Sequence, residues 1–150
     1  MKQILIADDD LSMRQALAES LESCGFEVET AENGADALQK FQKGKFEVVV
    51  TDMRMPKMTG MDVLRGIKKI APQTPVILIT AYGTVKTAVE AMKEGAAEFI
   101  MKPFSLDDLE FAVRNVLVTN KGIEEGKIEE SYPPVTEIIT RDPPIFASRK

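Results

Sequence analysis

The stretch Val48-Val49-Val50-Thr51-Asp52 is an apolar run that ends at a carboxylate, and it decides the fold of this 150-residue chain. Continuous rather than alternating apolar residues are typical of a strand covered on both faces, as in a parallel sheet between two layers of helices. Short apolar runs recur along the chain and predict five strands: Ile4–Ala7, Phe26–Thr30, Val48–Thr51, Val76–Thr80 and Phe99–Met101.

A segment with helical spacing of apolar residues follows each run, as in Val85, Ala88, Val89 and Met92 of the fourth segment. Parallel strands joined by helices require right-handed crossovers and give a three-layer sandwich. We therefore predict an α/β fold: a flavodoxin-like, doubly wound, five-stranded parallel sheet in the order 2-1-3-4-5 with five helices. The run Phe26–Thr30 alternates strictly, which predicts a half-exposed edge strand.

The composition excludes several kinds of site. There is no His, so Ser-His-Asp and Cys-His catalysis, His-ligated zinc and a phospho-His carrier are all ruled out. The single cysteine, Cys24, excludes an intrachain disulfide and a multi-Cys metal site. A net charge of −5 argues against binding of nucleic acid by this segment. The sequence shows neither a signal peptide nor a membrane span, so we expect no membrane partner and a cytoplasmic location.

Polar side chains end four of the five predicted strands. In an open parallel sheet, ligands bind beyond the carboxyl ends of the strands, near the point where the strand order reverses. We therefore expect these side chains to meet at one rim of the sheet. They are Asp8, Asp9 and Asp10 after the first strand, Asp52 after the third, Thr80 at the end of the fourth and Lys102 after the fifth.

The carboxylates of Asp8, Asp9 and Asp52 at one rim require a positive partner, because each like-charge contact at ~4 Å costs about 4 kcal/mol at an effective dielectric of ~20. Lys102 supplies one charge. An all-oxygen cluster suits a hard cation, Mg²⁺ first and Mn²⁺ second. A carboxylate beside such a cation, with a lysine and a hydroxyl nearby, is suited to accept a phosphoryl group. Asp52 is the candidate acceptor, because it is a lone carboxylate on the central third strand.

The same residues also have ordinary structural interpretations. Asp10 or Ser12 is expected to cap the helix that follows the first strand. Thr80 could be a common strand-end residue, and Lys102 a solvated lysine. We favour the functional interpretation because all of these positions fall on the rim where a sheet of this class binds its ligands.

Four motifs then reveal a family resemblance. ILIADDD (4–10), VVVTDMRMPKMTGMDVL (48–64), VILITAYG (76–83) and AAEFIMKPF (96–104) resemble the response-regulator receiver domain of two-component signalling, with the chemotaxis-regulator fold. The likeness covers residues 2–118 with every motif in order.

The resemblance implies that Asp52 is phosphorylated by a sensor histidine kinase. It makes Asp9 and Asp52 side-chain ligands of Mg²⁺, with Asp8 acting mainly through water and the backbone carbonyl of Arg54 completing the protein ligands. Lys102 would pair with the phosphoryl group.

The resemblance also implies a conformational switch. Thr80 would move to hydrogen-bond the phosphoryl group, and Phe99, at a position that often holds Tyr, could then rotate inward. The Lys102–Pro103 bond is expected to be cis. Bulky residues at Arg54 and Tyr82, two positions beyond the acceptor and the threonine, suggest slow intrinsic dephosphorylation.

A narrower likeness concerns residues 82–96, which look like receivers of the nitrogen-regulatory class that precede an ATPase driving alternative-sigma-factor (sigma-54) transcription. Residues 1–119 would form the receiver. Residues 120–150 would be a linker or C-terminal tail, either native or cut before an output domain. The sequence contains no phosphate-binding loop, so we expect this segment neither to hydrolyse ATP nor to bind DNA.

On the last helical segment, Phe111 and Val118 lie off the apolar stripe and share a second face. Both could simply be exposed apolar residues. The resemblance places a common receiver interface on the fourth helix, fifth strand and fifth helix. We therefore expect a phosphorylation-dependent homodimer that uses this face.

Two other functions remain open. A haloacid-dehalogenase-type Mg²⁺-dependent phosphatase also forms an aspartyl phosphate, but it needs a second carboxylate where this chain has Arg54. A pseudo-receiver would bind partners without ever being phosphorylated, and the intact set of acidic, hydroxyl and lysine residues argues against it.

Overall fold

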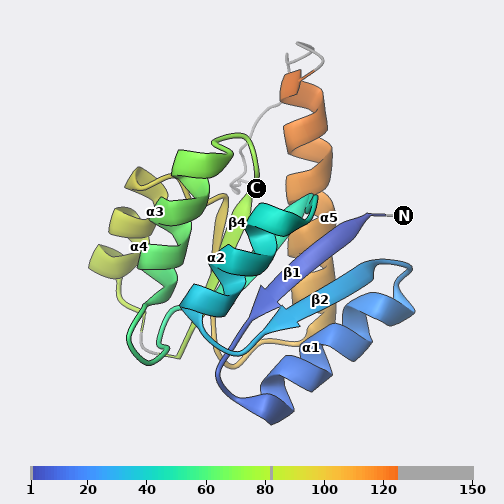
Figure 1. Ribbon diagram of the computed structural model, residues 1–150, viewed down its shortest axis with the longest axis horizontal. Helices are drawn as coiled ribbons and strands as arrows, with labels where there is room; N and C mark the ends of the chain where they lie inside the picture. Colours follow the sequence, from blue (N-terminus) through green and yellow to red (C-terminus); the bar gives the residue numbers. More distant parts are fainter. Residues whose placement is uncertain (1, 82, 125–150) are drawn as a thin grey trace, which may run out of the picture. The chain divides into compact units, whose positions relative to one another are not determined.

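The structure is a computed structural model that describes residues 2–81 and 83–124. Its five strands form one parallel sheet in the order β2-β1-β3-β4-β5 (Figure 1), which confirms the predicted fold class and strand order. The strands are β1 (Gln3–Ala7), β2 (Glu27–Ala31), β3 (Val48–Asp52), β4 (Val76–Thr80) and β5 (Glu98–Met101).

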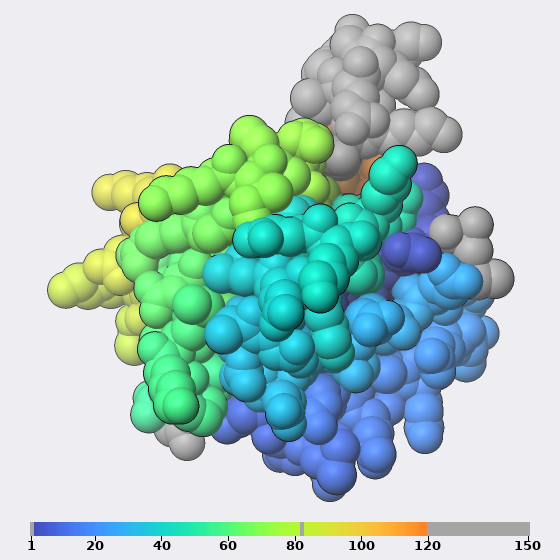
Figure 2. Space-filling model, viewed as in Figure 1, coloured from blue at the N-terminus to red at the C-terminus, as the bar shows by residue number. Residues whose placement is uncertain are grey.

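The helices cover both faces of the sheet. α1 and α5 pack on one face through side chains such as Leu17 and Leu109. α2, α3 and α4 pack on the other through Phe41, Leu64 and Ala91, and Figure 2 shows α2 (cyan) and α3 (green) lying against each other on this side. The helices are α1 (Leu11–Ser23), α2 (Gly34–Lys43), α3 (Gly60–Ile70), α4 (Val85–Lys93) and α5 (Leu106–Glu124).

The second strand begins one residue later than predicted. The backbone N–H of Phe26 donates to the carbonyl of Leu21 at 3.2 Å, so it closes the turn after α1 and does not join the sheet. The Phe26 ring is buried in the α1/α5 layer, beneath the guanidinium of Arg114. The apolar pattern therefore included Phe26 in the predicted strand, because its side chain lies in the core although its backbone belongs to the turn.

α4 buries a different side from the one that its large apolar residues would suggest. Val85 is 82% exposed, and Val89 and Met92 are also exposed, whereas Ala91 is fully buried. The small Ala91 side chain lets the helix lie close to the sheet, so the larger residues face outward. Helical spacing thus predicted the helix correctly but did not identify its buried face. Leu106, the first residue of α5, is also exposed.

Residues 1–117 form one compact unit, and residues 118–150 are grouped as a second. Most of the predicted linker or tail, residues 125–150, lies outside the described residues, so its assignment stays a prediction. Within residues 2–81 and 83–124, the structure contains no helix with the length and apolar character needed to cross a bilayer.

Gly60, the first residue of α3, lies against the backbone of the third strand. A Cβ at this position would be 2.5 Å from the carbonyl oxygen of Asp52 and 2.8 Å from the Cα of Met53. The Gly60 N–H also donates to the Met53 carbonyl at 2.9 Å. The absence of a side chain therefore allows α3 to begin directly beside the end of β3.

We predict that Gly60→Ala lowers the free energy of unfolding by about 1–3 kcal/mol, because the new methyl group meets rigid backbone. Urea unfolding would measure this change. Gly66→Ala in the same helix is the control, since its Cβ would meet only the flexible end of Leu38. Equal losses in the two variants would contradict the proposed role of backbone contact.

Candidate functional site

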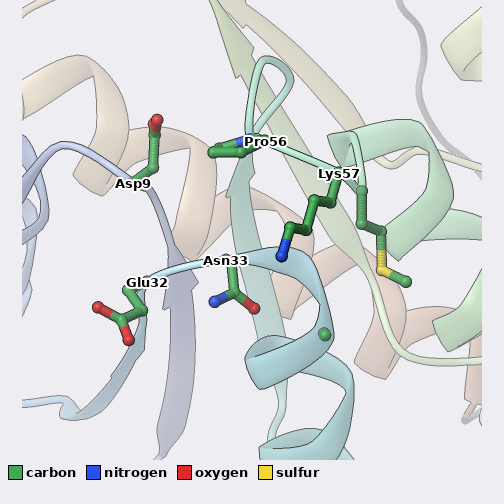
Figure 3. Close-up of a pocket in the computed structure, with 7 residues that line it drawn as sticks. Asp9, Glu32, Asn33, Pro56 and Lys57 are labelled. Carbon is green, nitrogen blue, oxygen red and sulfur yellow. The ribbon is translucent and has the colours of Figure 1, made fainter.

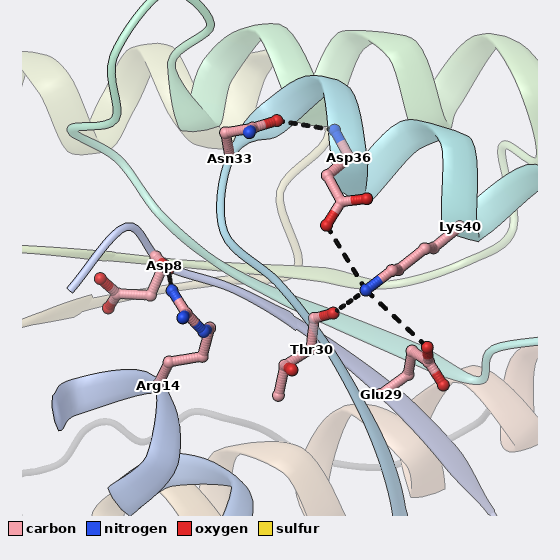
Figure 4. A network of polar contacts seen from close by, with 7 residues as sticks. All are labelled: Asp8, Arg14, Glu29, Thr30, Asn33, Asp36 and Lys40. Atoms are coloured by element: carbon pink, nitrogen blue, oxygen red, sulfur yellow. Dashed lines mark hydrogen bonds and ion pairs between the residues drawn. The ribbon is translucent and has the colours of Figure 1, made fainter. Parts of the chain in front are cut away.

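The end of β1 holds a tightly constrained acidic turn. Asp8 is 2% exposed, and its N–H donates to the Ala31 carbonyl of β2 at 3.1 Å. Its carboxylate Oδ1 accepts the Asp10 N–H at 2.9 Å. The guanidinium of Arg14, one turn into α1, donates to the Asp8 carbonyl at 2.7 Å (Figure 4). These bonds fix the direction in which Asp8 and Asp9 leave the strand.

The end of β3 places Asp52 in the middle of the rim. This residue is 7% exposed, and its Oδ1 lies 3.0 Å from the Lys102 ammonium. Its Oδ2 accepts the Arg54 N–H at 3.1 Å. The Lys102 N–H in turn donates to the carbonyl of Thr80 at 2.8 Å, which positions the loop after β5 beside β4. The Lys102–Pro103 peptide bond is cis, as predicted.

The two strand ends bring three carboxylates together. One oxygen from each of Asp8, Asp9 and Asp52 can be chosen so that all lie within 4.8 Å of one another. Two of these residues are buried and Asp9 is exposed, so the group opens to solvent on one side. Clustered carboxylate oxygens with an open approach fit the preference of Mg²⁺, which takes few protein carboxylates and retains water ligands.

Burial is the main cause that raises the pKa of Asp8, to about 6, and the negative charges of Asp52 and Asp9 act in the same direction. The Asp10 N–H and the Lys102 charge oppose this shift. For Lys102, burial alone would lower the pKa, but the hydrogen bond and charge of Asp52 outweigh it and raise the pKa. The ammonium therefore stays charged, and the cluster carries an excess of negative charge.

The structure gives Asp10 the ordinary role considered above. Its carboxylate accepts the N–H groups of Ser12 and Met13 and so caps α1. Arg54 projects an exposed side chain beside the acceptor strand, while Tyr82 lies outside the described residues. Phe111 and Val118 are both exposed on α5.

A shallow hollow of about 380 Å³ lies beside Asp9 (Figure 3). Its other walls come from the loops before α2 and α3, including Glu32, Asn33 and Lys57. Lys57 has a left-handed backbone with φ of 69°, and Figure 3 shows its ammonium reaching over the hollow toward Asn33. No pattern in the sequence indicated this hollow, because its walls are distant in sequence and the left-handed residue is not glycine.

The supporting interactions were also missed from the sequence. Arg14 stands one helical turn after Asp10, and that spacing from the acidic turn was the available signal. On the neighbouring strand, Lys40 of α2 bonds the Thr30 carbonyl and pairs with Glu29 and Asp36 (Figure 4), which ties β2 to α2.

Residues 4–114 match the family model described as the response regulator receiver domain. This chain belongs to that family. The receiver is 39% identical over 134 residues to the transcriptional regulatory protein ZraR of Klebsiella oxytoca, covering 89% of this chain and 28% of that protein. It spans about a quarter of the length of the curated relatives that it matches.

Solved structures agree with this assignment. A response regulator receiver domain protein from Clostridium thermocellum is 41% identical with a TM-score of 0.78, covering 82% of this chain and 99% of that one. The beryllofluoride-activated NtrC4 receiver domain, solved as a dimer, is 36% identical with a TM-score of 0.76, covering 80% and 99% of the two chains.

The raised pKa of Asp8 predicts that Asp8→Asn increases the free energy of unfolding of the metal-free receiver, by an amount that depends on pH. Between pH 3.8 and about 6 the folded protein binds more protons at Asp8 than the unfolded chain does, so the stability contributed by this group is lost as the pH rises. We expect the variant to be more stable than the wild type by about 1–3 kcal/mol above pH ~6, and the gain to vanish toward pH ~4.

Urea unfolding in the presence of a chelator, at several pH values, measures this difference. Asp10→Asn is the matched control, because an asparagine retains the helix cap. A gain from Asp8→Asn that does not depend on pH would contradict the assignment of the shifted group.

Proposed function

We propose that this receiver is a phosphorylation-controlled switch in which Asp52 accepts a phosphoryl group from a sensor histidine kinase. The observation that carries the proposal is the buried Asp52 carboxylate at 3.0 Å from Lys102, beside two further carboxylates. A carboxylate oxygen of Asp52 forms the new O–P bond while the N–P bond of the kinase phosphohistidine breaks. The histidine nitrogen keeps the electron pair, and Asp52 becomes an acyl phosphate.

The residues at the rim divide the work of this transfer. Asp9, Asp52 and the Arg54 carbonyl would hold Mg²⁺ directly, or Mn²⁺ in its place, with Asp8 acting mainly through water. When bound, the cation neutralises charge on the phosphoryl oxygens. The Lys102 ammonium already lies against Asp52 and can follow the added charge onto the phosphoryl group. The kinase supplies the histidine that the composition of this chain lacks.

Thr80 and Phe99 would convert the new charge into a change of shape. Phosphorylation adds about −1.5 to −2 charge and strong hydrogen-bond acceptors. Thr80, buried at the end of β4, moves its hydroxyl toward these acceptors, and Phe99 rotates into the space that is vacated. The exposed Arg54 side chain, two residues beyond Asp52, would hinder water from reaching the acyl phosphate, so we expect slow dephosphorylation.

We expect acetyl phosphate with Mg²⁺ to add one phosphoryl group to the wild type, and Asp52→Asn to abolish this addition. Intact-protein mass spectrometry measures the adduct. Asp10→Asn should still be modified, because Asp10 caps α1. An adduct that survives Asp52→Asn would sink the proposal, absence of any adduct would indicate a pseudo-receiver, and turnover of a phosphate ester would indicate a phosphatase.

The output face is proposed to be the surface of α4, β5 and α5. Exposed apolar side chains gather on these three elements, and Phe111 is 72% exposed. A second copy of the receiver is the proposed partner, since the related NtrC4 receiver was solved as an activated dimer. Among the residues of these elements whose side chains the structure describes, the large apolar ones that are exposed are Val85, Val89, Met92, Met101, Leu106, Phe111 and Val118.

We predict that Phe111→Glu leaves phosphorylation intact and weakens self-association of the phosphorylated receiver about tenfold, because a charge replaces an apolar contact. Sedimentation equilibrium measures the dimer. Ile70→Glu is the matched control, since Ile70 is exposed at the end of α3 rather than on the output face. An unchanged dimer in Phe111→Glu would remove this face from the proposal.

The wider role is proposed from the relatives. Several carry names that describe transcriptional regulatory proteins, and the receiver matches only part of their length. The receiver would therefore control a transcriptional output of the sigma-54-dependent class in the cytoplasm, joined through residues 120–150.

A further inference from the structure

Gly83, in the connection between β4 and α4, lies against both residues of the proposed switch. A Cβ built on Gly83 would be 2.8 Å from Cε2 and 3.0 Å from Cζ of Phe99, and 3.1 Å from Cγ2 of Thr80. Real Cβ atoms essentially never approach other heavy atoms below 3.0 Å. The ring and the methyl group therefore occupy the space where a side chain at position 83 would begin.

The sheet explains why these groups converge. Leu78 of β4 pairs with Phe99 of β5, so Phe99 and Thr80 are diagonal neighbours on adjacent strands. Side chains two residues apart on a strand point to the same face, which places both over the α3/α4 layer. Gly83 lies on the loop that closes over this diagonal pair.

Gly83 is required for space rather than for its backbone conformation. Gly25 and Gly95 have φ angles of 97° and 104°, in the left-handed region, but Gly83 does not lie in that region. An alanine could adopt the same backbone at position 83. Its methyl group would nevertheless collide with the Phe99 ring and crowd the Thr80 methyl.

We propose that Gly83 is a positioning residue of the switch. Because it has no side chain, Thr80 and Phe99 can both pack against position 83, which is the arrangement seen in the structure. The inference rests on the proposed function, in which both side chains move upon phosphorylation. Movement of Thr80 toward Asp52 withdraws its methyl group from position 83, and the Phe99 ring, as it follows into the vacated space beside β4, leaves the place it holds 2.8 Å from that position. A methyl group at position 83 therefore destabilises the arrangement in which Thr80 and Phe99 pack against this position. It thereby favours the arrangement that phosphorylation produces.

The way α4 is held lets this crowding reach the output face. At its C-terminal end, Glu94 pairs with Arg65 of α3 at 3.4 Å, and Lys68 lies close beside Gly95. At the other end, the first residue of α4 is the exposed Val85, two residues after Gly83. A shift of the loop at Gly83 therefore moves the first turn of α4 while α3 retains the last turn.

The test uses the receiver labelled with ¹⁹F-phenylalanine, with the Phe99 signal among seven phenylalanines assigned through Phe99→Leu. We expect beryllofluoride with Mg²⁺ to move this signal in the wild type. In Gly83→Ala, the signal should already lie displaced toward the activated position without beryllofluoride. This displacement corresponds to a roughly tenfold increase in the ratio of the activated arrangement to the one in which Thr80 and Phe99 pack against position 83. Adding Thr80→Ser removes the crowded methyl group and should return the signal part of the way.

Gly44→Ala is the matched control, because its Cβ would meet the Phe46 ring at 2.7 Å at the end of α2, in a contact that involves neither switch residue. Its Phe99 signal should remain at the wild-type position. A Gly83→Ala signal at the wild-type position, or one displaced away from the activated position, overturns the role of Gly83. If beryllofluoride does not move the wild-type signal, the proposed switch itself fails, and the inference falls with it.

Discussion

The carboxylates of Asp8, Asp9 and Asp52 approach within 4.8 Å of one another, and this crowding of like charge governs the rest of the site. Two of them are buried, so water cannot screen them fully, and the raised pKa of Asp8 reflects the cost. The Lys102 ammonium at 3.0 Å from Asp52 offsets part of the charge. A folded cluster with this excess of negative charge is well suited to a divalent cation, whose charge offsets the repulsion between the carboxylates.

The parallel sheet is what holds these charges together against their repulsion. β1 and β3 are paired neighbours, so their carboxyl ends present Asp8 and Asp52 to the same rim. Main-chain bonds from Asp8 to β2, and from Gly60 to Met53, fix both strand ends in the surrounding structure. The main-chain hydrogen bonds formed during folding offset the electrostatic repulsion between the carboxylates, and the site is preorganised as a result.

Much of this arrangement could be predicted from particular residues. Uninterrupted apolar runs identified the interior strands, and the polar residues after them identified the rim, because parallel strands end on the same side. Phe26 and the outward side of α4 were misjudged for one shared reason. The apolar character of a residue does not indicate whether its backbone joins the sheet. Nor does it indicate whether a smaller neighbour such as Ala91 packs closer to the core.

By itself, the sequence determined the fold class, the strand order, the family and the set of residues at the rim, since these follow from periodicity and from short motifs. Tertiary structure decided which groups touch. The Arg14 guanidinium donates a hydrogen bond to the Asp8 carbonyl, and Thr80 and Phe99 pack against Gly83, which has no side chain. Such contacts join segments far apart in the chain or depend on the absence of a side chain, and neither has a periodic signature that a sequence can display.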